Sequence, residues 1–421
     1  MASKVDKRKK KLFSNTIFLY LLVFSNYFFS LITVPYQTRV LGPEIYGKLG
    51  WAMATMAYFA IVVEFGFLLS ATERIARNRD DKREVERIVG AVVASKIALA
   101  LIGAIAVAVL SFTWGKMNSD PWFYLLCYAS AIIPSFLLDF FYRGIEEMQV
   151  ITIRSVATSA FFTVCIFIFL HDRNHYWVVP ALNATGSLIA VGAVFWHMTR
   201  KLKYRFVVPE ISYCWMIFKE SIWFFLSRIA TTFYTATNTF LLGFVYPVAS
   251  APIGYYTSAD KLLTVMKSAC SPVADSLYPY MVRNKDFRLL KKLLLIGMPI
   301  SIAIASVVWL LSDWICLILF GSEFAGAAPL LRLMLPIFVI TLPVYLLGFP
   351  TLSPLGGAKA VNRSVIFSAI FHIAALFVLF IGGWLSVRSV IVLTFITEIF
   401  ILVYRAIAIL RLRKILKGAG E

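Results

Sequence analysis

Apolar residues fall in runs of about 20 along the whole chain, separated by short polar segments. The hydrocarbon core of a bilayer is about 30 Å thick and a helix rises about 1.5 Å per residue, so one such run can cross it as a helix. No segment between the runs is long enough to form a separate soluble domain. The pattern predicts twelve membrane-spanning helices, at 12–34, 46–69, 89–112, 122–141, 151–170, 177–197, 217–243, 254–280, 289–311, 325–347, 364–382 and 387–410.

The composition leads to the same fold class. Hydrophobic residues make up 60% of the chain and charged residues 15%, whereas soluble domains have about 45–50% and about 25%. Such a chain has too few polar side chains to face water on all sides, which predicts an all-α integral membrane protein. The five cysteines form no C-x-x-C pair, so we expect space-filling thiols and no metal or other cofactor.

Lysine and arginine are strongly biased to one side of the predicted membrane. With a cytoplasmic N-terminus, the cytoplasmic segments hold 29 of these residues and the opposite side holds 5. Basic loops remain on the cytoplasmic side, so both termini are predicted to be cytoplasmic. The cytoplasmic basic residues are spread over seven short segments, which favours contact with anionic lipid headgroups over nucleic-acid binding.

An even number of spans suggests two halves of six. Faint similarity links 42–52 (GPEIYGKLGWA) to 250–259 (SAPIGYYTSA), and each lies between the first and second span of its half. Halves inserted in the same direction form a parallel repeat. The predicted organisation is a basic N-terminus at 1–11, an N-lobe at 12–197, a cytoplasmic linker at 198–216, a C-lobe at 217–410 and a basic cytoplasmic tail at 411–421.

The eighth span is unusually polar for a membrane helix. Asp260, Thr264, Lys267, Ser271 and Asp275 are spaced by 4, 3, 4 and 4 residues, which places them on one helical face. A charge at the centre of a membrane helix costs about 2.5–3.5 kcal/mol on the translocon scale. This face must therefore look into other protein or into a water-filled cavity.

Two further spans have a polar face of the same kind. The residues in question are Asn15, Asn26, Ser30, Thr33 and Gln37 on the first span, and Ser221, Arg228, Thr231, Thr232, Thr235 and Thr239, with Asn238 beside them, on the seventh. If the halves are related by symmetry, these helices meet at the interface between them, where transporters place their substrate site. The cations Arg228, Lys261 and Lys267 outweigh the nearby carboxylates, which calls for an anion or water.

Packing is the alternative for many of these groups, because hydroxyl and amide side chains commonly join membrane helices. Asp260 and Lys267 could pair across two turns of their own helix. Glu398 and Arg405, seven residues apart on the last span, are expected to pair with each other. Lys96 and Asp139 are expected to reach toward the cytoplasmic surface, and His372 to serve packing; the list of intramembrane charges also includes Glu64 and Arg332.

The sequence contains no H-E-x-x-H, Walker A or G-x-S-x-G motif, so it offers no sign of an enzyme. Several stretches instead resemble the Wzx-type polysaccharide (O-antigen) repeat-unit flippases, a polysaccharide biosynthesis family within the multidrug/oligosaccharidyl-lipid/polysaccharide (MOP) exporter superfamily. These stretches are 25–47 (SNYFFSLITVPYQTRVLGPEIYG), 64–81 (EFGFLLSATERIARNRDD), 141–155 (FYRGIEEMQVITIRS) and, more loosely, 320–324 (FGSEF). The chain departs from the family at Arg143, where a glutamine is common.

The resemblance implies two six-helix lobes in a V around a central cavity, as in MATE transporters. It implies movement of an undecaprenyl-pyrophosphate-linked glycan from the cytoplasmic to the periplasmic leaflet of the bacterial inner membrane, by alternating access. The other implied partners are the lipid bilayer, H⁺ or Na⁺ as a coupling ion, and other polysaccharide-assembly membrane proteins.

Under this resemblance the candidate residues take three roles. A pyrophosphate needs arginine or lysine, and the candidates are Arg228, Lys261, Lys267, Arg39 and Arg332. The candidates for the sugar are Asn26, Thr33, Gln37, Thr235, Asn238 and Thr264. The candidates for ion coupling are Glu64, Asp260 and Asp275.

Two alternative functions remain at the level of sequence. A multidrug or cation exporter of the same superfamily would call for an acidic cavity, whereas the membrane helices here hold more lysine and arginine than aspartate and glutamate. A membrane polysaccharide polymerase would call for clustered acid and base residues and usually a large external loop; no predicted external loop exceeds about a dozen residues.

Overall fold

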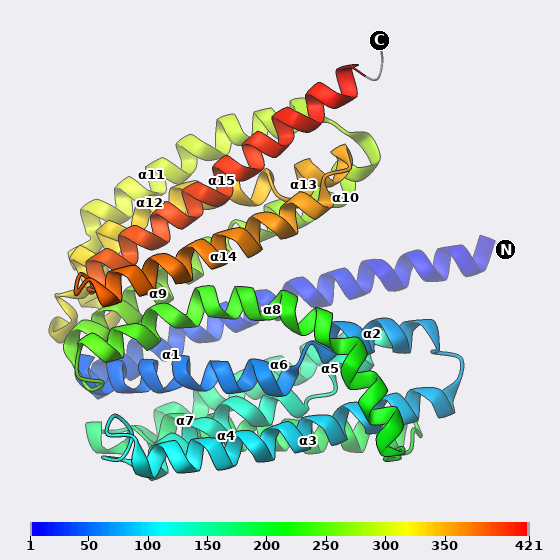
Figure 1. Ribbon diagram of the computed structural model, residues 1–421, viewed down its shortest axis with the longest axis horizontal. Coiled ribbons are helices and arrows are strands. Elements are labelled where there is room, and N and C mark those ends of the chain that lie inside the picture. Colours follow the sequence, from blue (N-terminus) through cyan, green and yellow to red (C-terminus); the bar gives the residue numbers. More distant parts are fainter. Residues whose placement is uncertain (1, 419–421) are drawn as a thin grey trace. The chain divides into compact units, whose positions relative to one another are not determined.

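The computed structural model describes the backbone of residues 2–418 and the side chains of 18, 20–25, 27–226, 228–229 and 236–412. Within this part of the chain the regular structure is helical and no strand is present (Figure 1). The predicted all-α class is therefore confirmed. Nine helices among the described residues are long and apolar enough to cross a membrane.

The helices follow the predicted spans closely, with additional short helices between them. In chain order they are α1 (Ala2–Glu64), α2 (Phe67–Arg77), α3 (Lys82–Thr113), α4 (Pro121–Ile132), η1 (Ile133–Phe136), α5 (Asp139–Gly144), α6 (Met148–Phe169), η2 (Arg173–His175), α7 (Val178–Trp196), η3 (His197–Lys201), α8 (Ile211–Val245), α9 (Ala251–Ser268), α10 (Ser271–Asn284), α11 (Phe287–Phe320), η4 (Ser322–Phe324), α12 (Ala327–Leu346), α13 (Phe349–Leu352), η5 (Ser353–Leu355), α14 (Ala358–Ile381) and α15 (Val387–Gly418).

The predicted number of twelve differs from nine for identifiable reasons. The first two predicted spans lie in α1, which is interrupted at Gly42 with φ 71° and ψ 169°. A side chain would be strained at this positive φ, and Pro43 follows, so glycine suits the break. The seventh predicted span corresponds to α8, and the eighth corresponds to α9 together with α10. These helices are not among the nine candidate membrane helices found in the described residues.

The chain forms two compact units. Unit 1 comprises Met1–Val40 and Ala52–Thr232, and unit 2 comprises Leu41–Trp51 and Phe233–Glu421. Each unit thus includes part of a helix that continues into the other, because α1 and α8 both cross a boundary. The predicted division at 197 and 217 stays a prediction.

The two units share an order of elements. In each, a spanning helix is followed by a short helix, α2 or α10, and then by a long helix, α3 or α11. Both long helices begin after an aspartate, Asp81 or Asp286, whose carboxylate accepts two backbone N–H groups of the first turn. Such N-caps satisfy donors that the helix leaves free. A further short helix, α5 or α13, occurs in each unit, and this common order supports the predicted repeat.

The similar segments 42–52 and 250–259 are in contact within unit 2. A Cβ added at Gly47 would lie 2.8 Å from the backbone nitrogen of Gly254, and one at Gly254 would lie 1.9 Å from the carbonyl oxygen of Pro43. Small residues allow two helix backbones to approach this closely. The Trp51 indole N–H also donates to the Phe240 carbonyl oxygen at 3.0 Å.

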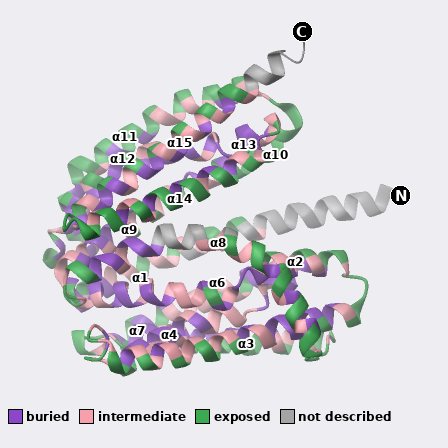
Figure 2. Cartoon of the chain, viewed as in Figure 1, coloured by how far each residue is buried: buried purple, intermediate pink, exposed green. Residues whose placement is uncertain are grey.

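Burial follows the membrane environment (Figure 2). In α11, large apolar side chains such as Leu310 and Trp314 are each 69% exposed, as expected for a surface that faces lipid. The main apolar core of unit 1 instead gathers where α2, α5 and the first turns of α3 pack together. It includes Phe67, Ile75, Ile88, Phe141 and Tyr142, all buried.

The predicted single helix at 254–280 is wrong in one respect. It is divided into α9 and α10, with Ala269 and Cys270 in a turn between them. Pro272 lies in the first turn of α10 and has no N–H to continue the helical hydrogen bonds. The polar positions predicted on one helix, from Asp260 to Asp275, are therefore divided between α9 and α10. The predicted span at 46–69 likewise ends at Glu64, where Phe65 and Gly66 have positive φ.

The contact between Gly254 and Pro43 gives a first prediction. Gly254→Ala should lower the melting temperature of the purified protein in detergent, because overpacking of a close contact costs about 1–3 kcal/mol. Gly192→Ala in α7 is the matched control, since no atom lies within 4 Å of an added Cβ there. Equal stability of the two variants would contradict the close approach.

Candidate functional site

The strongest concentration of polar side chains within the membrane helices of unit 2 starts from Lys267. Its Nζ lies 2.8 Å from Oε1 of Glu398, which joins α9 to α15. Glu398 is 5% exposed, so its negative charge depends on a partner inside the protein. The direct ion-pair partner of Lys267 is thus Glu398 on another helix, and not Asp260 of its own helix as the sequence suggested.

Asp260 lies about two turns before Lys267 on α9. Its carboxylate interacts electrostatically with Lys267 and with Lys261, and the buried phenols of Tyr46 and Tyr256 lie close to it. Lys261 is exposed and Asp260 is half-buried. Three of the predicted functional residues are therefore brought together on α9.

A second polar group connects α8, α14 and α15. His372 is fully buried, with Nε2 2.8 Å from Oδ1 of Asn238 and Nδ1 2.8 Å from Oγ1 of Thr397. The Asn238 amide N–H also donates to Oγ1 of Thr394 at 3.1 Å. Asn238 therefore contributes to helix packing, and His372 does so through specific hydrogen bonds.

The predicted pair of Glu398 and Arg405 is not the arrangement found. The Arg405 guanidinium donates to the backbone carbonyl of Val344 and, at 3.1 Å, to the Ser364 hydroxyl. Arg405 also lines a pocket of about 460 Å³ in unit 2 together with Asp275. Asp275 is exposed and is separated from Asp260 by the turn between α9 and α10.

The other predicted cations differ in their surroundings. Arg332 on α12 forms an ion pair with Asp313 and lies over the Trp309 ring, 5.5 Å from its centroid. Arg39 on α1 is exposed and Arg228 on α8 is half-buried, and both belong to unit 1.

The predicted sugar-binding residues are also divided. Thr33 is buried and donates to the Phe29 carbonyl oxygen of its own helix at 2.9 Å. Gln37 is buried as well, whereas Thr264 is exposed. Asn26 and Thr235 lie outside the residues whose side chains are described.

Glu64, predicted as a coupling residue, has a buried partner in unit 1. Its Oε2 lies 3.0 Å from Nζ of Lys96, which also donates to the Ser135 carbonyl oxygen at 2.7 Å. Lys96 is 1% exposed, so the expectation that it reaches the surface is wrong. Asp139 likewise pairs with Arg154, at 3.1 Å.

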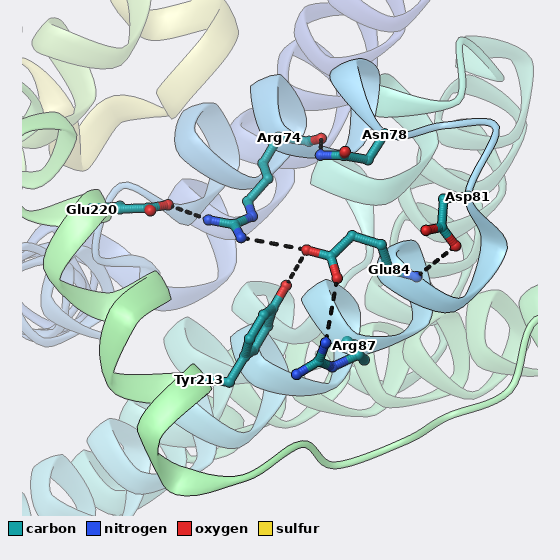
Figure 3. Close-up of polar contacts among 7 residues, drawn as sticks. All are labelled: Arg74, Asn78, Asp81, Glu84, Arg87, Tyr213 and Glu220. Atoms are coloured by element: carbon teal, nitrogen blue, oxygen red, sulfur yellow. Dashed lines mark hydrogen bonds and ion pairs between the residues drawn. The ribbon is translucent and has the colours of Figure 1, made fainter.

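A second charged cluster in unit 1 joins α2, α3 and the start of α8 (Figure 3). Arg74 donates to Glu220 at 2.7 Å and to Glu84 at 3.4 Å. Glu84 also accepts a hydrogen bond of 2.6 Å from the Tyr213 hydroxyl and lies 3.7 Å from Arg87. The cluster fixes α8 to the two preceding helices.

Tyr213 precedes the predicted span at 217–243. Burial, together with the hydrogen bond to Glu84, raises the pKa of Tyr213 to about 12. The phenol therefore keeps its proton at neutral pH and remains a donor to the Glu84 carboxylate.

The sequence identified the polar residues inside the membrane helices but not the residues with which they pair. Lys96, Glu398 and His372 were each visible as single polar residues in apolar runs, which is a sign of an intramembrane role. Their partners lie 32, 131 and 134 residues away in the chain, and no local spacing rule connects such distant positions. Arg74 lies in 64–81, which the resemblance had already marked, whereas its partners Glu84 and Glu220 lie outside that stretch.

The model of a family described as "Polysaccharide biosynthesis protein" matches residues 12–285, more than half of the 421 residues. The chain belongs to the polysaccharide biosynthesis protein family. The matched range includes α9 with Asp260, Lys261 and Lys267, and it ends before Glu398.

Relatives in this family include two curated bacterial proteins named "Putative O-antigen transporter". The protein from Escherichia coli (strain K12) is 25% identical over 346 residues, which cover 80% of this chain and 83% of the relative. The protein from Shigella dysenteriae is 26% identical over 403 residues, which cover 93% and 98%. Both relatives are named as transporters, and the predicted transporter class is confirmed.

Solved structures with the same fold include a MATE family transporter of the MOP superfamily and a lipid II flippase. An inward-facing MATE family multidrug transporter has a TM-score of 0.70 at 16% identity, with 93% of this chain and 95% of that chain covered. The lipid II flippase MurJ, in an inward closed conformation, has a TM-score of 0.67 at 12% identity, with 94% and 87% covered. At these identities the likeness concerns the fold, and the predicted MATE-like class is confirmed. This family member is a multi-pass membrane protein.

The ion pair of Lys267 and Glu398 gives a second prediction. Lys267→Gln should destabilise the protein strongly, since removing one partner of a buried pair costs about 3–5 kcal/mol. The double variant Lys267→Gln/Glu398→Gln should recover much of this loss, because it leaves no isolated charge. Melting temperatures in detergent measure both effects. A double variant no more stable than the single variant would argue against the pair.

The Arg74 cluster gives a third prediction. Glu84→Ala removes a shared acceptor of Arg74, Arg87 and Tyr213 and should cost about 1–3 kcal/mol. Glu73→Ala on α2 is the control, because its pair with Arg77 is exposed and such pairs contribute about 0–1 kcal/mol. Thermal unfolding should separate the two variants, and similar losses would contradict the role given to Glu84.

Proposed function

We propose that this protein moves lipid-linked oligosaccharide units from the cytoplasmic to the periplasmic leaflet of the bacterial inner membrane, for surface polysaccharide synthesis. The observation that carries the proposal is the family match over residues 12–285. The names of the two bacterial relatives, O-antigen transporters, support it. The proposed substrate is an undecaprenyl-pyrophosphate-linked glycan, and the proposed orientation has both termini in the cytoplasm.

The charges described above refine the residues proposed for the pyrophosphate. A pyrophosphate is a concentrated anion that calls for lysine or arginine. Lys267 already has a carboxylate partner in Glu398, so it would have to exchange this partner for the substrate. Exposed Lys261 on the same helix is proposed to provide positive charge that does not depend on opening that pair. Arg39 and Arg228 of unit 1 stay candidates for the same role. Arg332, paired with Asp313, is the weaker candidate.

The sugar and the coupling ion are assigned by the same reasoning. Exposed Thr264 follows Lys261 by three residues and is the preferred contact for sugar hydroxyls, while buried Thr33, Gln37 and Asn238 would act through helix packing. Asp260 is the preferred site for H⁺ or Na⁺, because binding a cation there would change its attraction to Lys267. Glu64, held by Lys96, and Asp275, on α10, come after it. Alternating access and contact with other polysaccharide-assembly membrane proteins complete the proposal.

Reconstitution tests the function directly, and it is the fourth prediction. Purified protein in liposomes should move a defined undecaprenyl-pyrophosphate oligosaccharide between leaflets, measured as glycan made accessible to an impermeant lectin or glycosidase. Lys261→Gln should slow this movement by about tenfold while leaving the melting temperature unchanged, because the side chain is exposed and a charge-assisted contact is worth about 1.5–3 kcal/mol.

The controls make the result specific. Lys359→Gln, an exposed lysine on α14 in the same unit, should move the substrate at the wild-type rate. The absence of movement by folded wild-type protein would contradict the proposed function. Normal movement by Lys261→Gln would contradict only the role of that lysine.

A further inference from the structure

A groove in unit 1 lies apart from all the residues considered so far for the glycan substrate. It runs between α6 and α7 and has a volume of about 470 Å³, which is within the usual range of about 300–1,000 Å³ for small-ligand sites. Its wall is almost entirely apolar. The apolar lining includes Val150, Ile153, Phe161, Ala193 and Trp196.

One end of the groove differs from the rest because basic side chains line it. Arg154, His197 and Lys201 line it there. Arg154 lies in the second turn of α6, whereas His197 and Lys201 belong to the turn that follows α7. The start of α6 and the end of α7 thus bring the three residues together at one end of the groove. An apolar groove with a basic end has the charge distribution that complements an anionic lipid.

The groups at this end are held in place by buried contacts. Arg154 pairs with Asp139 at 3.1 Å and its side chain is 11% exposed, while its Nε has no hydrogen-bond partner among the described atoms. The Tyr142 hydroxyl donates to the Val194 carbonyl oxygen at 3.0 Å, so it must accept from Nδ1 of His197, 3.1 Å away. A neutral His197 in this arrangement adds no positive charge, so Arg154 and Lys201 are the cations of this end.

The backbone at the basic end is also unusual. Residues His197–Lys201 form a π-helical turn, a rare conformation that occurs often at functional sites. Trp196, which precedes the turn, is 58% exposed, and exposed tryptophan is typical of the depth at which lipid headgroups begin. The polar end of the groove therefore lies where a headgroup would be.

We propose that this groove binds an anionic glycerophospholipid, with one acyl chain along α6 and α7 and the phosphate beside Lys201 and Arg154. The predicted orientation places this end at the cytoplasmic leaflet, which carries anionic lipid, and basic pockets between membrane helices are suited to such headgroups. A zwitterionic lipid would gain the apolar contact but would present its own ammonium group to the basic end. The proposal does not depend on the identity of the transported substrate.

This site also gives a physical role to 141–155, the segment marked by family resemblance. It contributes Tyr142, which orients His197, and Arg154, which lines the groove. The segment further contributes Val150 and Ile153 to the apolar wall. A segment that is not among the proposed substrate contacts would thus act as part of a lipid site.

Native mass spectrometry of the full-length protein tests the site, as the fifth prediction. Dioleoyl-phosphatidylglycerol and dioleoyl-phosphatidylethanolamine are titrated separately, so that only the headgroup differs. The wild-type protein should bind the first adduct of phosphatidylglycerol at least about fivefold more tightly, as expected for the contribution of one basic residue to an anionic lipid. Lys201→Gln should abolish most of that preference.

Two further variants complete the design. Arg200→Gln removes an exposed charge next to Lys201 that does not line the groove, and it should keep the preference. Ala193→Trp fills the groove and should weaken binding of both lipids, with a monodisperse elution profile as evidence of folding. Equal binding of the two lipids by the wild-type protein, or equal effects of Arg200→Gln and Lys201→Gln, would overturn the proposal. Displacement of phosphatidylglycerol by undecaprenyl phosphate at equimolar concentration would also overturn it, in favour of a substrate-lipid site.

Discussion

A charge inside the hydrocarbon region must find its partner within the protein, and this constraint governs how the helices are joined. Lys96 pairs with Glu64 in unit 1, and Lys267 pairs with Glu398 in unit 2. In each case the two residues come from different helices. Since an unpaired charge would be costly at that depth, each pair also fixes the relative position of the helices that carry it.

Interrupted helices supply the other acceptors that buried cations need. Lys96 donates to the Ser135 carbonyl oxygen in η1, and Arg405 donates to the Val344 carbonyl oxygen in the last turn of α12. Carbonyl groups at the end of a helix lack intrahelical partners and carry a partial negative charge. In both units, therefore, a buried cation stabilises the end of a membrane helix just before a short helix, α5 or α13. The two units reach the same solution with cations from different spans, α3 in one and α15 in the other.

Hydrophobic runs predicted the helices well because the length of a membrane helix is set by the bilayer, whatever its neighbours are. They did not predict the break at Phe65 and Gly66, where φ is positive, or the turn at Ala269 and Cys270 that divides α9 from α10. Pro272 was a local signal for the second break. The first break has only Gly66, with φ 74°, and a single glycine is too common in membrane helices to predict one.

The candidate site was less predictable because its charges depend on partners from the distant C-terminal helices. The sum of Arg228, Lys261 and Lys267 predicted an excess of positive charge. Glu398 on α15 reduces that excess because its carboxylate pairs with Lys267. The positive charge available to the proposed substrate then depends on cations without a buried carboxylate partner, such as exposed Lys261, rather than on the total number of lysines and arginines. The ion pair of Lys267 and Glu398 links α9 to α15, and under the proposed function an anion that competed for Lys267 would weaken that link. Substrate binding and helix rearrangement would in this way depend on the same ion pair.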